Sequence, residues 1–123
     1  CQGTFKGGNL STLSHLLGTR FQPDFNEAVL FLEDIGESAY KIDRMLSQMK
    51  MAGLFKGIQG VIIGSFKNCD NHEYIEEIVH EIFEGDNVPI LMGLDSGHGQ
   101  VNLSLNMGTR IKMDTKSAGI YWA

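Results

Sequence analysis

Ala28-Val29-Leu30-Phe31-Leu32-Glu33 is a nearly continuous apolar run that ends in a carboxylate. An apolar run without polar alternation is typical of a strand covered on both faces, as in a parallel sheet. Two further apolar runs, residues 58–66 and 88–92, follow at intervals long enough for a helix. The three runs therefore predict a buried parallel core.

Helical patterns occupy the intervals between these strands. Residues 38–52 carry apolar side chains at helical spacing, and Gly53 is placed to end that helix. Asp70-Asn71-His72-Glu73 fits a capping box that opens the next helix, which Gly85 ends. Parallel strands joined by helices form right-handed crossovers, so these segments predict a β-α-β-α-β core.

The two ends of the chain extend this core. Residues 3–13 suggest a short strand, a turn at Gly7-Gly8 and the start of a helix capped by Asn9 or Ser11. Beyond Gly99, apolar and polar residues alternate, which is typical of half-exposed antiparallel strands. The alternating positions are Val101, Leu103 and Leu105, then Ile111 and Met113, then Ile120 and Trp122, with a turn at 114–117 before the last strand. The sequence thus predicts an α/β domain with a mixed sheet and a β-rich C-terminal tail.

Composition narrows the classes of function. The 123 residues are enough for one domain with its own core. The net charge of −5, with scattered basic residues, argues against a nucleic-acid partner. No apolar run approaches the ~20 residues that cross a bilayer, so no membrane contact is expected. The two cysteines do not form a disulfide framework.

The chain begins at Cys1 without a methionine, and we expect it to be part of a longer protein.

Glu33 and His98 are the candidate catalytic residues. Glu33 ends a buried strand, where open α/β sheets bind ligands, and His98 lies between Gly97 and Gly99 after another such strand. Flanking glycines leave an imidazole uncrowded, and imidazole suits proton transfer near neutral pH. Two alternatives stay open: Glu33, with Asp34, serves only as a charge at the following helix N-terminus, and His98 is only structural.

No residue of this chain is a convincing nucleophile or metal ligand. Ser65, Ser96 and Ser104 lack the strand–elbow–helix setting of a catalytic serine. The other histidines lack the partners of a zinc site and are expected at the surface. They are His15, His72 and His80.

Several tracts together resemble a known family. They are Gly7-Gly8-Asn9-Leu10-Ser11, Leu32-Glu33-Asp34-Ile35-Gly36-Glu37, Tyr40-Lys41-Ile42-Asp43-Arg44-Met45-Leu46, Gly60-Val61-Ile62-Ile63-Gly64-Ser65-Phe66, Pro89-Ile90-Leu91 and Gly97-His98-Gly99. In order and spacing they are similar to the C-terminal domain of the LD-carboxypeptidases, the muramoyl-tetrapeptide carboxypeptidases that include microcin C immunity proteins. The resemblance covers essentially the whole chain, residues 1–123.

The resemblance implies a swivelling β/β/α-type fold and a serine peptidase with a Ser-Glu-His triad. Glu33 matches the carboxylate and His98 the general base, while the serine belongs to an N-terminal domain that this chain lacks. The substrate implied is a murein tetrapeptide that loses a terminal D-amino acid, typically D-Ala, during cell-wall recycling in the bacterial cytoplasm. No cofactor is implied, and a homodimer is compatible with the family. The chain alone is expected to be inactive.

Two other hypotheses stay open beside this one. The first is a microcin-type immunity peptidase, which cleaves an amide in a peptidyl-nucleotide antibiotic. The second is a non-enzymatic binding or dimerisation module that keeps the fold without the nucleophile. The chain also departs from the family, whose members often carry proline near Asn106-Met107-Gly108, and this departure bears on substrate fit.

Overall fold

The computed structural model describes all 123 residues and contains one six-stranded sheet with the strand order β4-β3-β2-β1-β5-β6. The first four strands run parallel, and β5 and β6 pair antiparallel to their neighbours. The strands are β1 (Gln2–Asn9), β2 (Ala28–Ile35), β3 (Gly60–Lys67), β4 (Ile90–Met92), β5 (Arg110–Asp114) and β6 (Gly119–Trp122). The predicted mixed sheet, with a parallel core and an antiparallel C-terminal pair, is confirmed.

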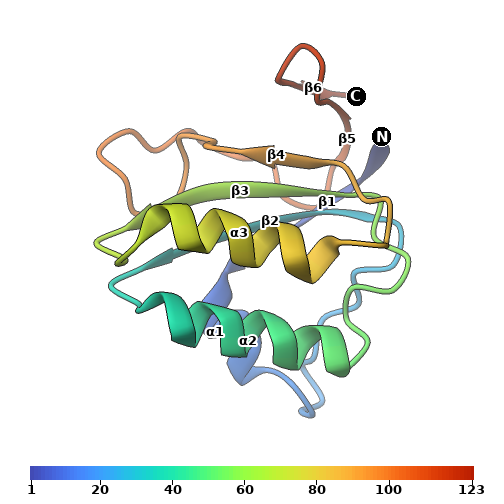
Figure 1. The fold of residues 1–123 in the computed structure, drawn as a ribbon. Coiled ribbons are helices and arrows are strands. Elements are labelled where there is room, and N and C mark those ends of the chain that lie inside the picture. The colour runs from blue at the N-terminus through green and yellow to red at the C-terminus, as the bar shows by residue number, and fades with distance from the viewer.

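Three helices connect the parallel strands and lie on one face of the sheet (Figure 1). They are α1 (Leu10–His15), α2 (Ala39–Met51) and α3 (His72–Phe83). Asn9 caps α1, because its side chain accepts from the Thr12 backbone N–H. Apolar residues at helical spacing, such as Ile42, Leu46 and Met49 of α2, are fully buried against the sheet.

The two faces of the sheet are covered differently. A cluster of 21 buried residues fills the space between the helices and the sheet, and it includes Leu30 and Leu32 of β2. The opposite face has a cluster of only six, including Val29 and Phe31 of the same strand. Loop residues such as Leu94 and Leu105 pack on that second cluster. We call this second side the loop face. No helix is long and apolar enough to cross a membrane.

The prediction of a turn at Gly7-Gly8 was wrong. Both glycines lie inside β1, which continues to Asn9 and pairs with β2. At Gly7, an added Cβ would lie 1.9 Å from the Phe31 carbonyl oxygen. Glycine is therefore present because the two backbones approach closely, rather than because the chain turns.

The predicted strand across Val101, Leu103 and Leu105 was also wrong. Residues 101–105 form no strand, and the Leu103 N–H donates to the Asp95 carbonyl within the same loop. Leu105 packs on the loop face while Val101 and Leu103 are exposed. A loop lying on an apolar sheet face can show the same polar alternation as an edge strand.

The expected capping box at the start of α3 is replaced by a different arrangement. Asn71 caps α3 by accepting from the Tyr74 N–H at 3.4 Å. Asp70 instead accepts from the Ala39 N–H, at the start of α2, at 2.6 Å. The acidic residue before α3 thus satisfies the N-terminus of the neighbouring helix, which sequence spacing does not reveal.

Candidate active site

The candidate site lies where β2 and β3 reach the carboxyl edge of the sheet. Side chains along a strand alternate between its two faces. Since Leu30 and Leu32 face the helices while Val29 and Phe31 face the other way, the alternation directs Glu33 to the loop face and Asp34 to the helices. Two adjacent carboxylates are therefore delivered to opposite sides of the sheet.

Asp34 has a structural role at the N-terminus of the preceding helix α1, and not at the following helix α2 as the alternative interpretation of the sequence expected. It is 2% exposed, and its Oδ2 accepts from the Ser11 N–H at 3.0 Å and from the Ser11 hydroxyl at 2.7 Å. Its Oδ1 accepts from the Asn9 amide at 3.0 Å and from the Ile35 N–H at 2.8 Å. Four donors satisfy this buried carboxylate, which ties the first turn of α1 to the end of β2.

Glu33 and His98 are brought together across 65 residues of sequence. The Glu33 Oε2 lies 2.7 Å from the His98 Nδ1, a short distance typical of a charge-assisted hydrogen bond. The Glu33 side chain is 6% exposed, whereas the His98 side chain is 48% exposed. A buried carboxylate therefore holds one ring nitrogen and leaves the other side of the imidazole toward solvent.

Hydrogen bonds made by Ser96 and Gly97 hold the loop that carries His98 in place. The Ser96 carbonyl accepts from the Ser65 N–H of β3 at 2.9 Å. The Ser96 hydroxyl donates to the Leu103 carbonyl at 3.0 Å, and the Gly97 N–H donates to the Asn102 side-chain oxygen at 3.2 Å. Asn102 was missed by sequence reasoning, because nothing in its immediate neighbours distinguishes it from an ordinary loop residue.

Gly97 lies where no other residue fits. Its φ is +117°, a region that L-residues rarely adopt. An added Cβ would lie 2.7 Å from the Glu33 Oε2 and 2.8 Å from the Ser65 Oγ. The glycine before the histidine is thus needed for the close approach of the loop to the carboxylate, beyond the conformational freedom that the sequence indicated.

None of the three serines considered from the sequence is placed as a nucleophile within this chain. The Ser65 hydroxyl is buried, and Ser96 is 4% exposed with its hydroxyl bound inside the loop. Ser104 is exposed on the irregular segment 101–105. No group of three or more His, Cys, Asp or Glu side chains is close enough to hold a metal ion.

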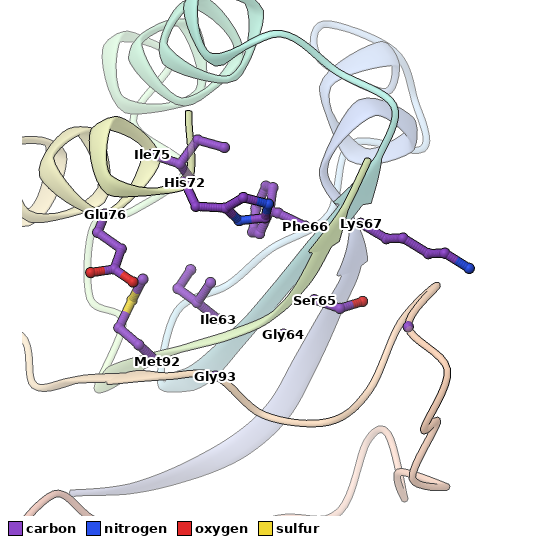
Figure 2. A pocket seen from close by; sticks show the side chains of 11 residues that line it. Ile63, Gly64, Ser65, Phe66, Lys67, His72, Ile75, Glu76, Met92 and Gly93 are labelled. Carbon is purple, nitrogen blue, oxygen red and sulfur yellow. The ribbon is translucent and has the colours of Figure 1, made fainter. Parts of the chain in front are cut away.

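A cleft of about 510 Å³ adjoins the histidine loop at the ends of β3 and β4 (Figure 2). Ile63, Ile75 and Met92 form its apolar wall, and His72 and Glu76 of α3 lie along its side. In Figure 2 the Ser65 side chain points away from this apolar wall, toward the loop that follows Gly93. The cleft therefore leads from α3 to the segment that carries His98.

Cys69 has a buried thiol near this edge of the sheet. Burial raises the pKa of its thiol, and the nearby Asp34 and Glu37 charges act in the same direction against the backbone hydrogen bonds that lower it. Cys1 and Cys69 are both free thiols. A raised thiol pKa disfavours the thiolate, so Cys69 does not have the character of a nucleophile.

The α/β domain presents a carboxylate-bound imidazole at the carboxyl edge of its parallel strands, and such an imidazole can act as a general base. Comparison with known proteins shows the family to which this domain belongs. Residues 2–113 match the LD-carboxypeptidase C-terminal domain family. The chain belongs to this family, as the resemblance predicted.

Curated relatives extend the match over nearly the whole chain. A putative carboxypeptidase of Synechocystis sp. is 34% identical over 118 residues, covering 92% of this chain and 39% of the relative. A probable murein peptide carboxypeptidase of Bacillus subtilis is 34% identical over 119 residues, covering 93% of this chain and 37% of the relative. The chain thus spans less than half the length of these relatives.

Solved structures share the fold. The muramoyltetrapeptide carboxypeptidase of Oxalobacter formigenes matches with a TM-score of 0.84 and 30% identity, over 98% of this chain and 44% of that chain. The microcin C7 self-immunity protein, known by sequence from Escherichia coli, matches with a TM-score of 0.89 and 28% identity, over 98% of this chain and 37% of that chain. These matches confirm the predicted α/β fold class of the family's C-terminal domain.

Proposed function

We propose that this chain supplies the carboxylate and the general base of a serine-type LD-carboxypeptidase. The observation that carries the proposal is the 2.7 Å contact between the buried Glu33 Oε2 and the Nδ1 of the half-exposed His98. The nucleophilic serine belongs to a second domain, upstream in the parent protein. The lengths of the relatives, of which this chain covers less than half, support such a domain.

Each residue has a definite role in the proposed reaction. Glu33 accepts from the His98 Nδ1–H, which fixes the tautomer whose Nε2 is a free base. Nε2 removes the proton of the serine hydroxyl as its oxygen attacks the carbonyl carbon of the peptide bond. The C–N bond then breaks, and His98 gives the proton to the leaving amine of the D-amino acid. Water, deprotonated by the same Nε2, hydrolyses the resulting acyl-enzyme.

The substrate proposed is a murein tetrapeptide, from which the enzyme releases a terminal D-amino acid, typically D-Ala. Support comes from the names of two relatives, a murein peptide carboxypeptidase and a muramoyltetrapeptide carboxypeptidase. The half-exposed imidazole and the adjoining cleft leave this edge of the sheet open to a peptide. The proposal includes a role in the recycling of cell-wall peptides, because release of a terminal D-amino acid from a murein tetrapeptide is a step of peptide breakdown.

The test is release of D-Ala from a murein tetrapeptide by the parent protein that carries the upstream domain. Glu33→Gln is expected to lower kcat about 10⁴-fold, because the imidazole loses the partner that fixes its tautomer. The 123-residue chain alone is expected to release no D-Ala. His80→Ala, which removes an exposed histidine of α3, is the matched control and is expected to retain full activity.

Two results would contradict the proposal. One is D-Ala release by the isolated chain at a rate near that of the parent protein, since the proposed nucleophile would then be unnecessary. The other is an inactive parent protein whose Glu33 and His98 are intact, which would favour a binding or dimerisation module. Both outcomes are read from one assay with one substrate.

A microcin-type immunity peptidase is the second candidate, favoured by the structural match to the microcin C7 self-immunity protein. Solved complexes of that protein hold glutamyl sulfamoyl guanosine and aspartyl sulfamoyl adenosine. Assaying the parent protein with an aminoacyl sulfamoyl adenosine beside the murein tetrapeptide separates the two candidates. Preferential hydrolysis of the murein peptide supports the first, and the reverse preference supports the second.

A further inference from the structure

A bulge interrupts β3 directly opposite the candidate catalytic carboxylate. In the pairing of β2 with β3, Leu32 faces Ile63 and Asp34 faces Phe66. Glu33 alone is therefore opposed by two residues, Gly64 and Ser65, which is the definition of a β-bulge. Bulges of this kind change the direction of a side chain, and they are common beside active sites.

The bulge couples β3 to the loop that carries His98. The Ser65 N–H donates to the Ser96 carbonyl at 2.9 Å, so at this point β3 pairs with the loop. At the preceding residue, an added Cβ on Gly64 would lie 2.6 Å from the same carbonyl oxygen. The loop thus rests directly on the two bulged residues.

The Ser65 hydroxyl has no hydrogen-bond partner in this arrangement. Its oxygen is fully buried and has no hydrogen-bond partner, although buried hydroxyls are normally paired. A Cβ added at Gly97 would lie 2.8 Å from the Ser65 Oγ and 2.7 Å from the Glu33 Oε2, so both oxygens lie beside Gly97. A buried donor without an acceptor therefore lies next to a buried carboxylate.

Glu33 has capacity to accept from this donor. An ionised carboxylate has about four acceptor positions, and the one hydrogen bond of the Glu33 side chain is that to the His98 Nδ1. Asp34, equally buried on the opposite face, accepts from four donors. Glu33, the carboxylate that faces His98, therefore accepts fewer hydrogen bonds than Asp34. The nearby hydroxyl without a hydrogen-bond partner is that of Ser65.

We propose that Ser65 is a positioning residue for the Glu33–His98 pair: its hydroxyl, turned toward the loop by the bulge, donates to the Glu33 carboxylate directly or through one water. The donated hydrogen bond fixes the carboxylate in the rotamer that meets Nδ1. Ser65 does not touch the reacting atoms, and its effect on rate passes through His98. Its catalytic consequence rests on the function proposed above, whereas its effect on the pair does not.

The primary test observes the pair in the 123-residue chain without any substrate. In ¹⁵N-histidine-labelled protein, the exchange of the His98 Nδ1–H with water reports how firmly Glu33 holds it. Ser65→Ala is expected to accelerate that exchange about tenfold, the effect of one lost hydrogen bond to a charged group. Ser38→Ala removes the other buried hydroxyl without a partner, at the start of α2, and is expected to leave the exchange unchanged.

A second pair of variants guards against misfolding of Ser65→Ala. Ser65→Thr keeps the hydroxyl, while Ser65→Val has nearly the same shape without it, and both suit a strand. Slow exchange in Ser65→Thr with fast exchange in Ser65→Val supports the proposal. Equal exchange in these two variants, or in Ser65→Ala and Ser38→Ala, overturns it.

The activity arm uses the parent protein with the upstream domain. Ser65→Ala is expected to lower kcat about tenfold with KM nearly unchanged, and Ser65→Thr to recover most of the loss. A merely structural role would instead lower the melting temperature and leave kcat of the folded enzyme intact, which overturns the proposal. If the wild-type parent protein releases no D-amino acid, the proposed function fails while the exchange measurement still decides the role of Ser65.

Discussion

Gly97→Ala is the substitution whose effect follows most directly from the geometry of the site. The new Cβ would lie 2.7 Å from the Glu33 Oε2, 2.8 Å from the Ser65 Oγ and 3.0 Å from the Glu33 Cβ, where ordinary contacts are 3.4–4 Å. The loop or the carboxylate must therefore move by several tenths of an ångström. Since the Glu33–His98 contact is 2.7 Å long, a movement of that size takes it to the limit of hydrogen bonding.

The cost has two parts. At a φ of +117°, an L-residue loses about 1–3 kcal/mol relative to glycine. Loss of the Glu33–His98 hydrogen bond adds about 1 kcal/mol, a low value because His98 is half exposed and water screens the pair. We expect the free energy of unfolding to fall by about 2–4 kcal/mol, with the sheet and helices retained.

Urea denaturation and a histidine spectrum of the 123-residue chain measure both effects. Gly93→Ala is the matched control, because Gly93 has a φ of +83° in the same loop but no atom within 4 Å of an added Cβ. It is expected to cost only about 1 kcal/mol and to keep the His98 Nδ1–H protected from exchange. The reasoning is refuted if Gly97→Ala matches Gly93→Ala in stability and keeps that proton protected.

Two further predictions concern buried groups near the site. Asp34→Asn is expected to lower the free energy of unfolding by about 3 kcal/mol, because the new amide turns a donor toward donors, whereas Ser11→Ala is expected to cost about 1 kcal/mol. Urea denaturation measures both, and equal costs would contradict the four-donor account of Asp34. Cys69 contributes a pH dependence: since burial raises its thiol pKa above the ordinary 9.0, the thiol ionises first in the unfolded chain, and stability falls as pH rises above that value. The stability difference between wild type and Cys69→Ala, followed from neutral pH to about 10.5, should shift in favour of the variant, and a pH-independent difference would refute this.

The layers of the fold were accessible from the sequence because apolar runs and helical spacing report local burial. The strands that begin at Ala28 and Gly60, and the helix that begins at Ala39, lie close to their predicted positions. The sequence-based predictions were wrong where the type of a residue is determined by a contact with a residue distant in the sequence. Gly7 is glycine because β2 approaches it, and Leu105 is apolar because it covers the loop face, neither of which is a local signal.

Some residues of the candidate site could likewise be predicted from the sequence, and others could not. Glu33 and His98 became candidates from their neighbours, a carboxylate after a buried strand and an imidazole between glycines, and the resemblance to the family favoured their catalytic roles. Ser65 and Asn102 were not assigned supporting roles, since a bulge and a side-chain-to-loop hydrogen bond arise only from strand pairing and loop closure. The two candidate catalytic residues were thus visible in the sequence, and the residues that contact them were found in the structure.

By itself the sequence determined that two adjacent carboxylates, Glu33 and Asp34, end a buried strand, and that an imidazole is available elsewhere in the chain. The residue pattern alone left open which carboxylate meets the imidazole, and only the resemblance to the family favoured Glu33. A continuous apolar run has no polar alternation, so it carries no information on which face of the strand the helices cover. Only the tertiary structure decides this, by packing Leu30 and Leu32 under the helices, which turns Asp34 toward α1 and leaves Glu33 to face His98.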